Sequence, residues 1–157
     1  MPVALSFTVE TNGRLPTGES LKSAIDRVDA ATCFYAQYFM VNCAHPLHFR
    51  HVFDVREPWM DRIRGVRANS SMRSHAELDN STELDAGNPT ALAEQCSELK
   101  RLLPSLNIVG GCCGTDHRHI EEIARVCSTE RARRGQITAN YGVAAFRTAS
   151  SRPRFAD

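Results

Sequence analysis

Ile108-Val109-Gly110-Gly111-Cys112-Cys113-Gly114-Thr115 joins a short apolar run to two adjacent cysteines that are bracketed by glycines. The apolar run, which begins at Leu106 and ends at Val109, predicts a buried strand. Thr115 or Asp116 can cap a helix that follows the cysteines. The apolar residues of that helix recur at helical spacing: Ile120, Ile123, Ala124 and Cys127. This stretch therefore predicts a strand and a helix joined by a loop that carries two thiols.

The chain before this stretch repeats the same order of strand and helix. Strands are expected at three apolar runs: Val3–Val9, Tyr38–Val41 and Ile63–Ala68. The helices between them begin at capping or first-turn residues: Ser20, Pro46 and Asn88. Alternation of this kind is typical of a parallel sheet covered by helices, so the fold class is α/β. The polar segment Asn69–Gly87 is expected to be an insertion, and no structure is predicted for it.

The six cysteines fall into two groups. Cys96 and Cys127 lie on the apolar stripes of their predicted helices, where a free cysteine behaves as a small hydrophobic residue. Cys33, which precedes a strand, is also expected to be structural. The other three each follow an apolar strand: Cys43, Cys112 and Cys113. Because loops at the carboxyl ends of parallel strands build one edge of a sheet, we expect these three thiols to converge.

Three converging thiolates suit Zn²⁺, which takes sulfur at roughly 2.3 Å and prefers four ligands. Three protein ligands leave one position open, which is the pattern of a catalytic zinc site. The spacing of the cysteines alone does not establish a zinc site, because the sequence lacks the paired CxxC motifs of a structural zinc site. Adjacent cysteines also serve simply to fill a core.

Two motifs carry a resemblance to a known family. Val41-Asn42-Cys43 and Gly110-Gly111-Cys112-Cys113-Gly114-Thr115 resemble the zinc-binding motifs of the homocysteine S-methyltransferases. Leu5-Ser6-Phe7-Thr8 and Arg67-Ala68-Asn69-Ser70 resemble strand ends of that family, and the likeness covers about residues 3–127. The resemblance implies a (β/α)8 barrel of the TIM type, with Zn²⁺ held by the three cysteines at the two motifs.

A barrel of this type needs at least about 200 residues, whereas this chain has 157. The resemblance therefore implies a partial barrel of about four β-α units, equivalent to the C-terminal half. We expect this partial homocysteine-binding domain to span residues 1–134, and residues 135–157 to form an irregular or disordered tail. Because an open half-barrel exposes edge strands, we expect self-association or a partner chain that carries the N-terminal half-barrel.

The family resemblance also implies the reaction, which is methyl transfer to the zinc-bound thiolate of homocysteine, giving methionine. The small methyl donor is not specified, because family members use S-methylmethionine, betaine or a methylated folate. No catalytic residue is implied beyond the metal ligands. The substrate-binding residues stay unknown, because the family's groups for the ammonium and carboxylate of the amino acid have no counterpart in the sequence. The alternative is a non-catalytic zinc-binding half-barrel, either a remnant or an interaction module.

Composition and charge narrow the remaining function classes. The net charge of +1 gives no field that favours nucleic acid or a membrane surface. No apolar run approaches the roughly 20 residues that span a bilayer, and no secretory signal is recognisable, so a cytoplasmic protein is expected. Four histidines near the cysteines are expected to lie on solvated helix faces rather than to bind metal: His45, His48, His117 and His119.

Overall fold

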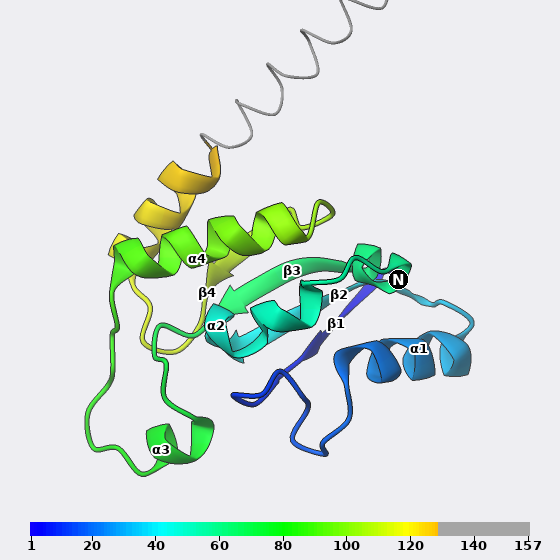
Figure 1. Cartoon of the computed structure of the whole chain (residues 1–157), viewed down its shortest axis with the longest axis horizontal. Helices are drawn as coiled ribbons and strands as arrows, with labels where there is room; N and C mark the ends of the chain where they lie inside the picture. Colours follow the sequence, from blue (N-terminus) through cyan, green and yellow to red (C-terminus); the bar gives the residue numbers. More distant parts are fainter. Residues whose placement is uncertain (129–157) are drawn as a thin grey trace, which may run out of the picture. The chain divides into compact units, whose positions relative to one another are not determined.

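A computed structural model describes residues 1–128, and these form a parallel sheet covered by helices (Figure 1). The described strands are β1 (Val3–Phe7), β2 (Ala36–Ala44), β3 (Ile63–Ala68) and β4 (Ile108–Gly111). Each strand pairs in parallel with the next one along the chain, in the order β1-β2-β3-β4. The predicted α/β class is confirmed, and this topology is compatible with part of a barrel. The predicted tail at residues 135–157 lies outside the described residues.

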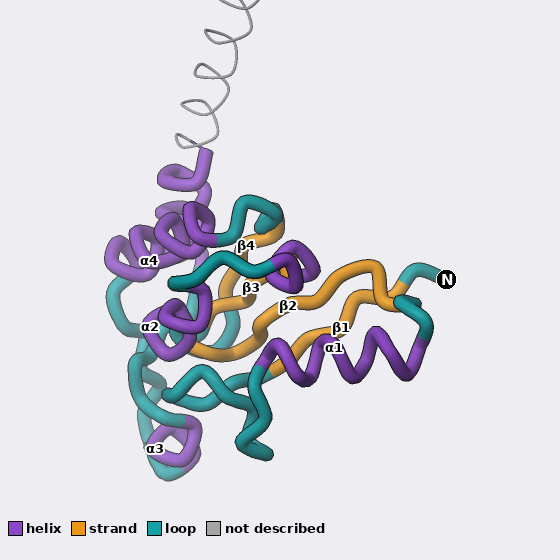
Figure 2. Tube along the Cα trace, turned by 45° about the vertical axis from the view of Figure 1, so that its right-hand side comes forward, coloured by secondary structure: helices purple, strands orange, loops and turns teal. Residues whose placement is uncertain are grey.

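Helices connect successive strands (Figure 2). They are α1 (Leu21–Thr32), α2 (Pro46–Phe49), α3 (His75–Asp79), α4 (Pro89–Leu102) and the 3-10 helices η1 (Arg50–Phe53) and η2 (Pro58–Arg62). A further helix begins at residue 117 and continues to the end of the described residues. In the described part of the chain, no helix is both long and apolar enough to cross a bilayer.

The sequence signals at the starts of the two longest described helices are confirmed. The Ser20 side chain accepts a hydrogen bond from the Ser23 amide and so caps α1. The Asn88 side chain accepts from the Ala91 amide at 3.0 Å, and Pro89 occupies the first turn of α4. Each such cap satisfies a backbone donor that a helix start leaves unpaired, which is worth about 1 kcal/mol.

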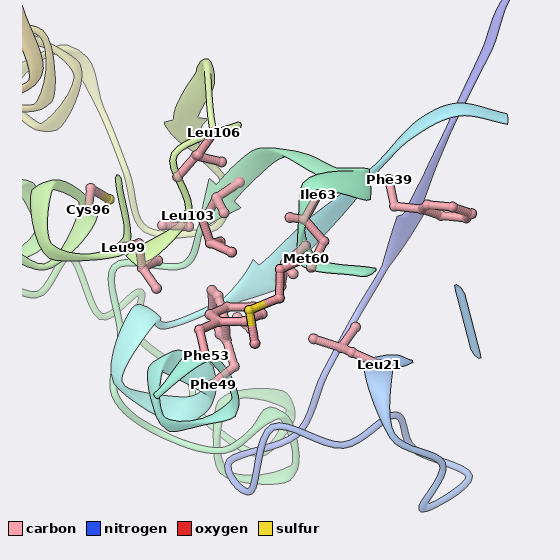
Figure 3. Packing of buried hydrophobic residues seen from close by; sticks show 14 of the residues in the cluster. Leu21, Phe39, Phe49, Phe53, Met60, Ile63, Cys96, Leu99, Leu103 and Leu106 are labelled. Atoms are coloured by element: carbon pink, nitrogen blue, oxygen red, sulfur yellow. The ribbon is translucent and has the colours of Figure 1, made fainter. Parts of the chain in front are cut away.

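The core lies on the face of the sheet that the helices cover (Figure 3). Val41 pairs in register with Val66, and Val66 pairs with Val109; all three belong to the apolar cluster or pack against it. Helical residues close this cluster: Leu21 and Ile25 from α1, Phe49 from α2, and Leu92 and Leu99 from α4. Because side chains alternate along a strand, the residues next to these valines point to the opposite face.

The boundaries of three strands differ from expectation. β1 ends at Phe7 rather than at Val9, although Val9 is fully buried. β2 is longer than predicted at both ends, and β4 spans Ile108–Gly111 rather than Leu106–Val109. The observed ends of β2 and β4 follow from their pairing with β3. A pattern of apolar residues along one strand carries no information about such pairing. The prediction for β3 itself is confirmed at both ends.

The predicted inward face of the last helix is confirmed at Ile123 and Cys127 but is wrong at Ile120 and Ala124. His119, Ile123 and Cys127 are buried, whereas Ile120 is 46% exposed and Ala124 is also exposed. The helix is fixed by a hydrogen bond that the His119 Nε2 donates to the Ala86 carbonyl at 2.8 Å. This contact turns the helix so that a polar residue takes an inward position.

Cys96 and Cys127 are buried, as predicted, but Cys33 is exposed at the C-cap of α1. Cys33 has a left-handed backbone with a φ of 51°, and its amide donates to the Asp29 carbonyl. Its structural role is therefore to end a helix and not to fill the core.

Candidate metal centre

Three thiols from two strand ends meet at one edge of the sheet. Cys43 is the second-last residue of β2, and Cys112 and Cys113 directly follow β4. The Sγ atom of Cys113 lies 3.4 Å from that of Cys43 and 3.9 Å from that of Cys112. All three Sγ atoms lie within 4.8 Å of one another. The structure thus brings together the three cysteines that the sequence singles out.

The sulfur spacing fits a zinc ion. Ligand sulfurs in a tetrahedral zinc site with bonds of about 2.3 Å are about 3.8 Å apart. The distances of 3.4 and 3.9 Å between the cysteine sulfurs bracket this spacing. Cys43 and Cys112 are half-buried and Cys113 is exposed, so the cluster remains accessible to a fourth ligand. The donor set therefore suits zinc with one open position.

An irregularity in β2 directs Cys43 toward the other two thiols. The pairing with β3 shifts between Asn42 and Ala44, which leaves Cys43 as an extra residue with a φ of 53°. Such bulges re-aim a side chain next to a site, and a left-handed backbone costs roughly 1–2 kcal/mol for a residue other than glycine. His75 holds this conformation, because its Nε2 donates to the Cys43 carbonyl at 2.8 Å. The side-chain nitrogen of Asn69 (Nδ2) lies 3.8 Å from the Cys43 sulfur and donates to it.

The cysteine pair after β4 is held by the loop that follows β3. The Ser70 amide and hydroxyl both donate to the Cys113 carbonyl, at 3.1 and 3.3 Å. The Ser70 hydroxyl also lies 2.8 Å from the Asp85 carbonyl, so one side chain joins two loops. Gly114 has a φ of 75°, and a Cβ atom there would lie 1.9 Å from the Ser70 hydroxyl and 2.3 Å from the Asp85 carbonyl. Only glycine fits this close approach.

The electrostatics of the cluster favour one thiolate over three. Burial, together with hydrogen bonds to Cys112 and Cys113, raises the pKa of the Cys43 thiol to about 12. Burial also opposes the charged form of Cys112, but hydrogen bonds from Cys43 and Cys113, together with the positive charge of Arg67, outweigh it and hold the Cys112 pKa below its usual range. The charged thiolate of Cys112 therefore suppresses ionisation of its neighbour. A dication would offset this repulsion and favour ionisation of all three.

A pocket of about 410 Å³ opens beside the sulfurs. Cys43, Cys113 and Asn69 line one part of it, and the segment from His75 to Asp85, which includes α3, lines the rest. A larger hollow of about 560 Å³ is lined by Arg73 and by residues of and next to α3, and it touches none of the three cysteines. We therefore regard the smaller pocket as the approach to the cluster.

The histidines are placed differently from expectation. His45 is buried, not solvated: its Nδ1 accepts from the Leu47 amide at 3.4 Å, and burial followed by the charge of His48 lowers its pKa to about 4. His48 is half-buried and its Nε2 donates to the Met72 carbonyl at 2.9 Å. His119 is fully buried, as described above, whereas His117 is exposed as expected. None of these four is among the clustered metal-ligand candidates of residues 1–128.

The residues that sequence reasoning missed lie in the segment Asn69–Gly87. His75, Ser70 and Asp85 hold the cysteines in place, yet the segment has no apolar period that predicts structure. One signal was present, namely the pattern Ser74-His75-Ala76-Glu77. Ser74 and Glu77 form a reciprocal capping box at the start of α3, and that pattern predicts a helix.

The comparison with known families agrees with this geometry. A family model described as homocysteine S-methyltransferase matches residues 1–127. The chain belongs to the homocysteine S-methyltransferase family. The match contains all four described strands and the three clustered cysteines, and it confirms the family resemblance of the two cysteine motifs. No curated protein sequence matches the chain. As a member of this family, the chain is associated with methyl transfer in general.

Proposed function

We propose that this chain transfers a methyl group from a small donor to the thiol of homocysteine, giving methionine, at a zinc ion held by Cys43, Cys112 and Cys113. The observation that carries the proposal is the spacing of the three sulfurs, which suits zinc and lies beside a pocket. Membership of the homocysteine S-methyltransferase family supports the reaction class.

The residues of the chain would act by position and charge. Bound zinc would supply a Lewis acid that favours the deprotonated form of a substrate thiol near neutral pH. The three cysteine thiolates carry one negative charge more than the dication neutralises, so the centre would keep a nucleophilic sulfur electron-rich. His75 and Ser70 fix the two loops that carry the thiolates. The attacking sulfur lone pair forms the bond to the methyl carbon, the donor departs with the electron pair of the broken bond, and the thiol proton goes to solvent.

The direct test is a transfer assay with the zinc-loaded 157-residue chain. Homocysteine is supplied with one methyl-labelled donor at a time: S-methylmethionine, betaine or a methylated folate. We expect labelled methionine from one of these donors, and a fall of at least about 100-fold in the Cys113→Ser variant, because one zinc ligand is lost. If homocysteine binds but no donor gives methionine, the transferase proposal fails and a non-catalytic zinc-binding module becomes the better account.

We also propose that the sheet is a segment of a (β/α)8 barrel that is completed by further strands. In the described part of the chain, β1 pairs only with β2 and β4 only with β3, so each has a free edge. Ala4, Leu5 and Ser6 of β1 are exposed. Free parallel edges of this kind favour added strands, from a second copy or from a chain carrying the N-terminal half-barrel.

Self-association has a simple readout. We expect light scattering on the purified chain to give a mass well above 17.4 kDa, falling toward 17.4 kDa on dilution. A single species at 17.4 kDa at all concentrations would contradict self-association and leave only a different partner chain, which co-purification from the native source would reveal as a second band. Absence of both would contradict the proposal of a completed barrel.

A further inference from the structure

Arg67 lies at the centre of the three strand ends that form the metal centre. It is the second-last residue of β3, the strand between β2 and β4. In register, Arg67 pairs with Asn42 on one side and with Gly110 on the other. Asn42 directly precedes Cys43, and Gly110 lies two residues before Cys112. The backbone of Arg67 is therefore flanked by both strands that carry cysteines.

The side chain of Arg67 lies on the face of the sheet opposite the core. Val66 is buried in the apolar cluster, so alternation along the strand places Arg67 on the other face, where it is exposed. There is room beside it, because a Cβ atom added at Gly110 would meet no atom within 4 Å. A small group of a ligand can therefore occupy the space next to the guanidinium.

Arg67 differs from most arginines of the described chain in having no recorded acceptor. Ion pairs are formed by Arg27, Arg50, Arg56, Arg62, Arg73, Arg118 and Arg125. Within residues 1–128, no hydrogen bond or ion pair is recorded for the Arg67 guanidinium. Its register neighbour Asn42 has a buried Oδ1 atom that also has no hydrogen-bond partner. The Arg67 guanidinium thus has no recorded hydrogen-bond acceptor, although its positive charge acts on the Cys112 sulfur and helps to lower the pKa of that thiol.

We propose that Arg67 binds the carboxylate of an α-amino-acid thiol whose sulfur lies at the cysteine cluster, an inference that rests on the proposed function. A guanidinium presents two parallel N–H groups that match the two oxygens of a carboxylate. The thiol and the carboxylate of homocysteine are separated by a short aliphatic chain, and Arg67 lies on the strand between the two that carry the cysteines.

The experiment compares two thiols that differ only in the carboxylate. Homocysteine and homocysteamine, which is the same molecule without its carboxylate, are titrated calorimetrically into the zinc-loaded 157-residue chain. We expect the wild type to bind homocysteine about 10- to 100-fold more tightly, as charge-assisted hydrogen bonds to a carboxylate predict. Arg67→Gln should lose this preference while its affinity for homocysteamine stays unchanged, and Arg67→Lys should recover part of it.

Arg64→Gln is the matched control, because Arg64 is an exposed arginine on the same strand and its removal changes the net charge equally. This variant should keep the full preference for homocysteine. If Arg67→Gln weakens both thiols equally, Arg67 only balances the charge of the cysteines and the proposal is overturned.

Two further outcomes would overturn it. The first is an Arg67→Gln variant that keeps the preference for homocysteine. The second is unchanged homocysteine binding with a raised KM for the methyl donor, which would assign the carboxylate to the donor instead. Failure of the proposed function is read separately. Without a metal site that accepts a thiol, neither thiol would bind even to the wild type. Without methyl transfer, the labelled-donor assay would give no methionine while the binding preference of the wild type for homocysteine remained.

Discussion

Replacing Cys43, Cys112 or Cys113 with alanine is expected to abolish stoichiometric zinc binding. Each substitution removes one of three sulfurs that lie within 4.8 Å of one another, and two protein ligands do not hold zinc against solvent. Loss of even an outer hydrogen bond to a ligand costs 10- to 100-fold in metal affinity, so loss of a ligand should cost at least about 1,000-fold. Zinc content per chain after repletion and gel filtration, with chelator competition, measures the effect.

Cys33→Ala is the control for this series. Cys33 is also an exposed thiol, but it caps α1 and is not among the clustered cysteines. Its replacement should leave one zinc per chain. Full zinc content in all three cluster variants would show that the metal, if any, is bound elsewhere.

Gly114→Ala is expected to destabilise the fold and weaken zinc binding together. A Cβ atom at this position would lie 2.3 Å from the Asp85 carbonyl oxygen, which is backbone and cannot rotate away, and the φ of 75° adds strain. We expect a loss of about 3 kcal/mol or more in the free energy of unfolding. Because Gly114 directly follows Cys113, the displaced loop should also lower zinc affinity. Urea unfolding of the zinc-free chain and chelator competition measure the two effects separately.

Gly18→Ala separates backbone strain from steric overlap. Gly18 has a φ of 83°, but a Cβ atom there would meet nothing within 4 Å. Its substitution should therefore cost only the strain of a left-handed alanine, about 1 kcal/mol, and leave zinc affinity unchanged. Equal losses of stability in the two variants would contradict the close packing of Gly114 against the loop after β3.

The parts of the fold that the sequence predicts are those with local physical signals. Ser20 and Asn88 cap helices through hydrogen bonds that depend only on nearby backbone, so both helix starts are recognisable. The convergence of Cys43 with Cys112 and Cys113 is predictable for a different reason. Parallel strands end at the same edge, so cysteines at neighbouring strand ends are expected to meet, although the bulge that aims Cys43 has no signal in the sequence.

The parts that could not be predicted depend on contacts between distant segments. His119 takes an inward position because it binds the Ala86 carbonyl, and nothing in the spacing of Ile120 and Ala124 reveals this. His75 reaches the Cys43 carbonyl from a segment 32 residues later in the chain. The capping box at the start of α3 is recognisable in the sequence. The contact between His75, the first residue of α3, and Cys43 is not. The exposed position of Arg67 likewise depends on which face of β3 the helices cover.

The central claim is that the three cysteines hold zinc with a position open to the substrate thiol. The most direct test is zinc X-ray absorption on the metal-repleted chain, before and after addition of homocysteine. We predict one zinc per chain, with sulfur coordination that rises from three to four when homocysteine is added. One zinc whose sulfur coordination does not change would contradict the thiol-acceptor site, and a chain without zinc would contradict the metal centre itself.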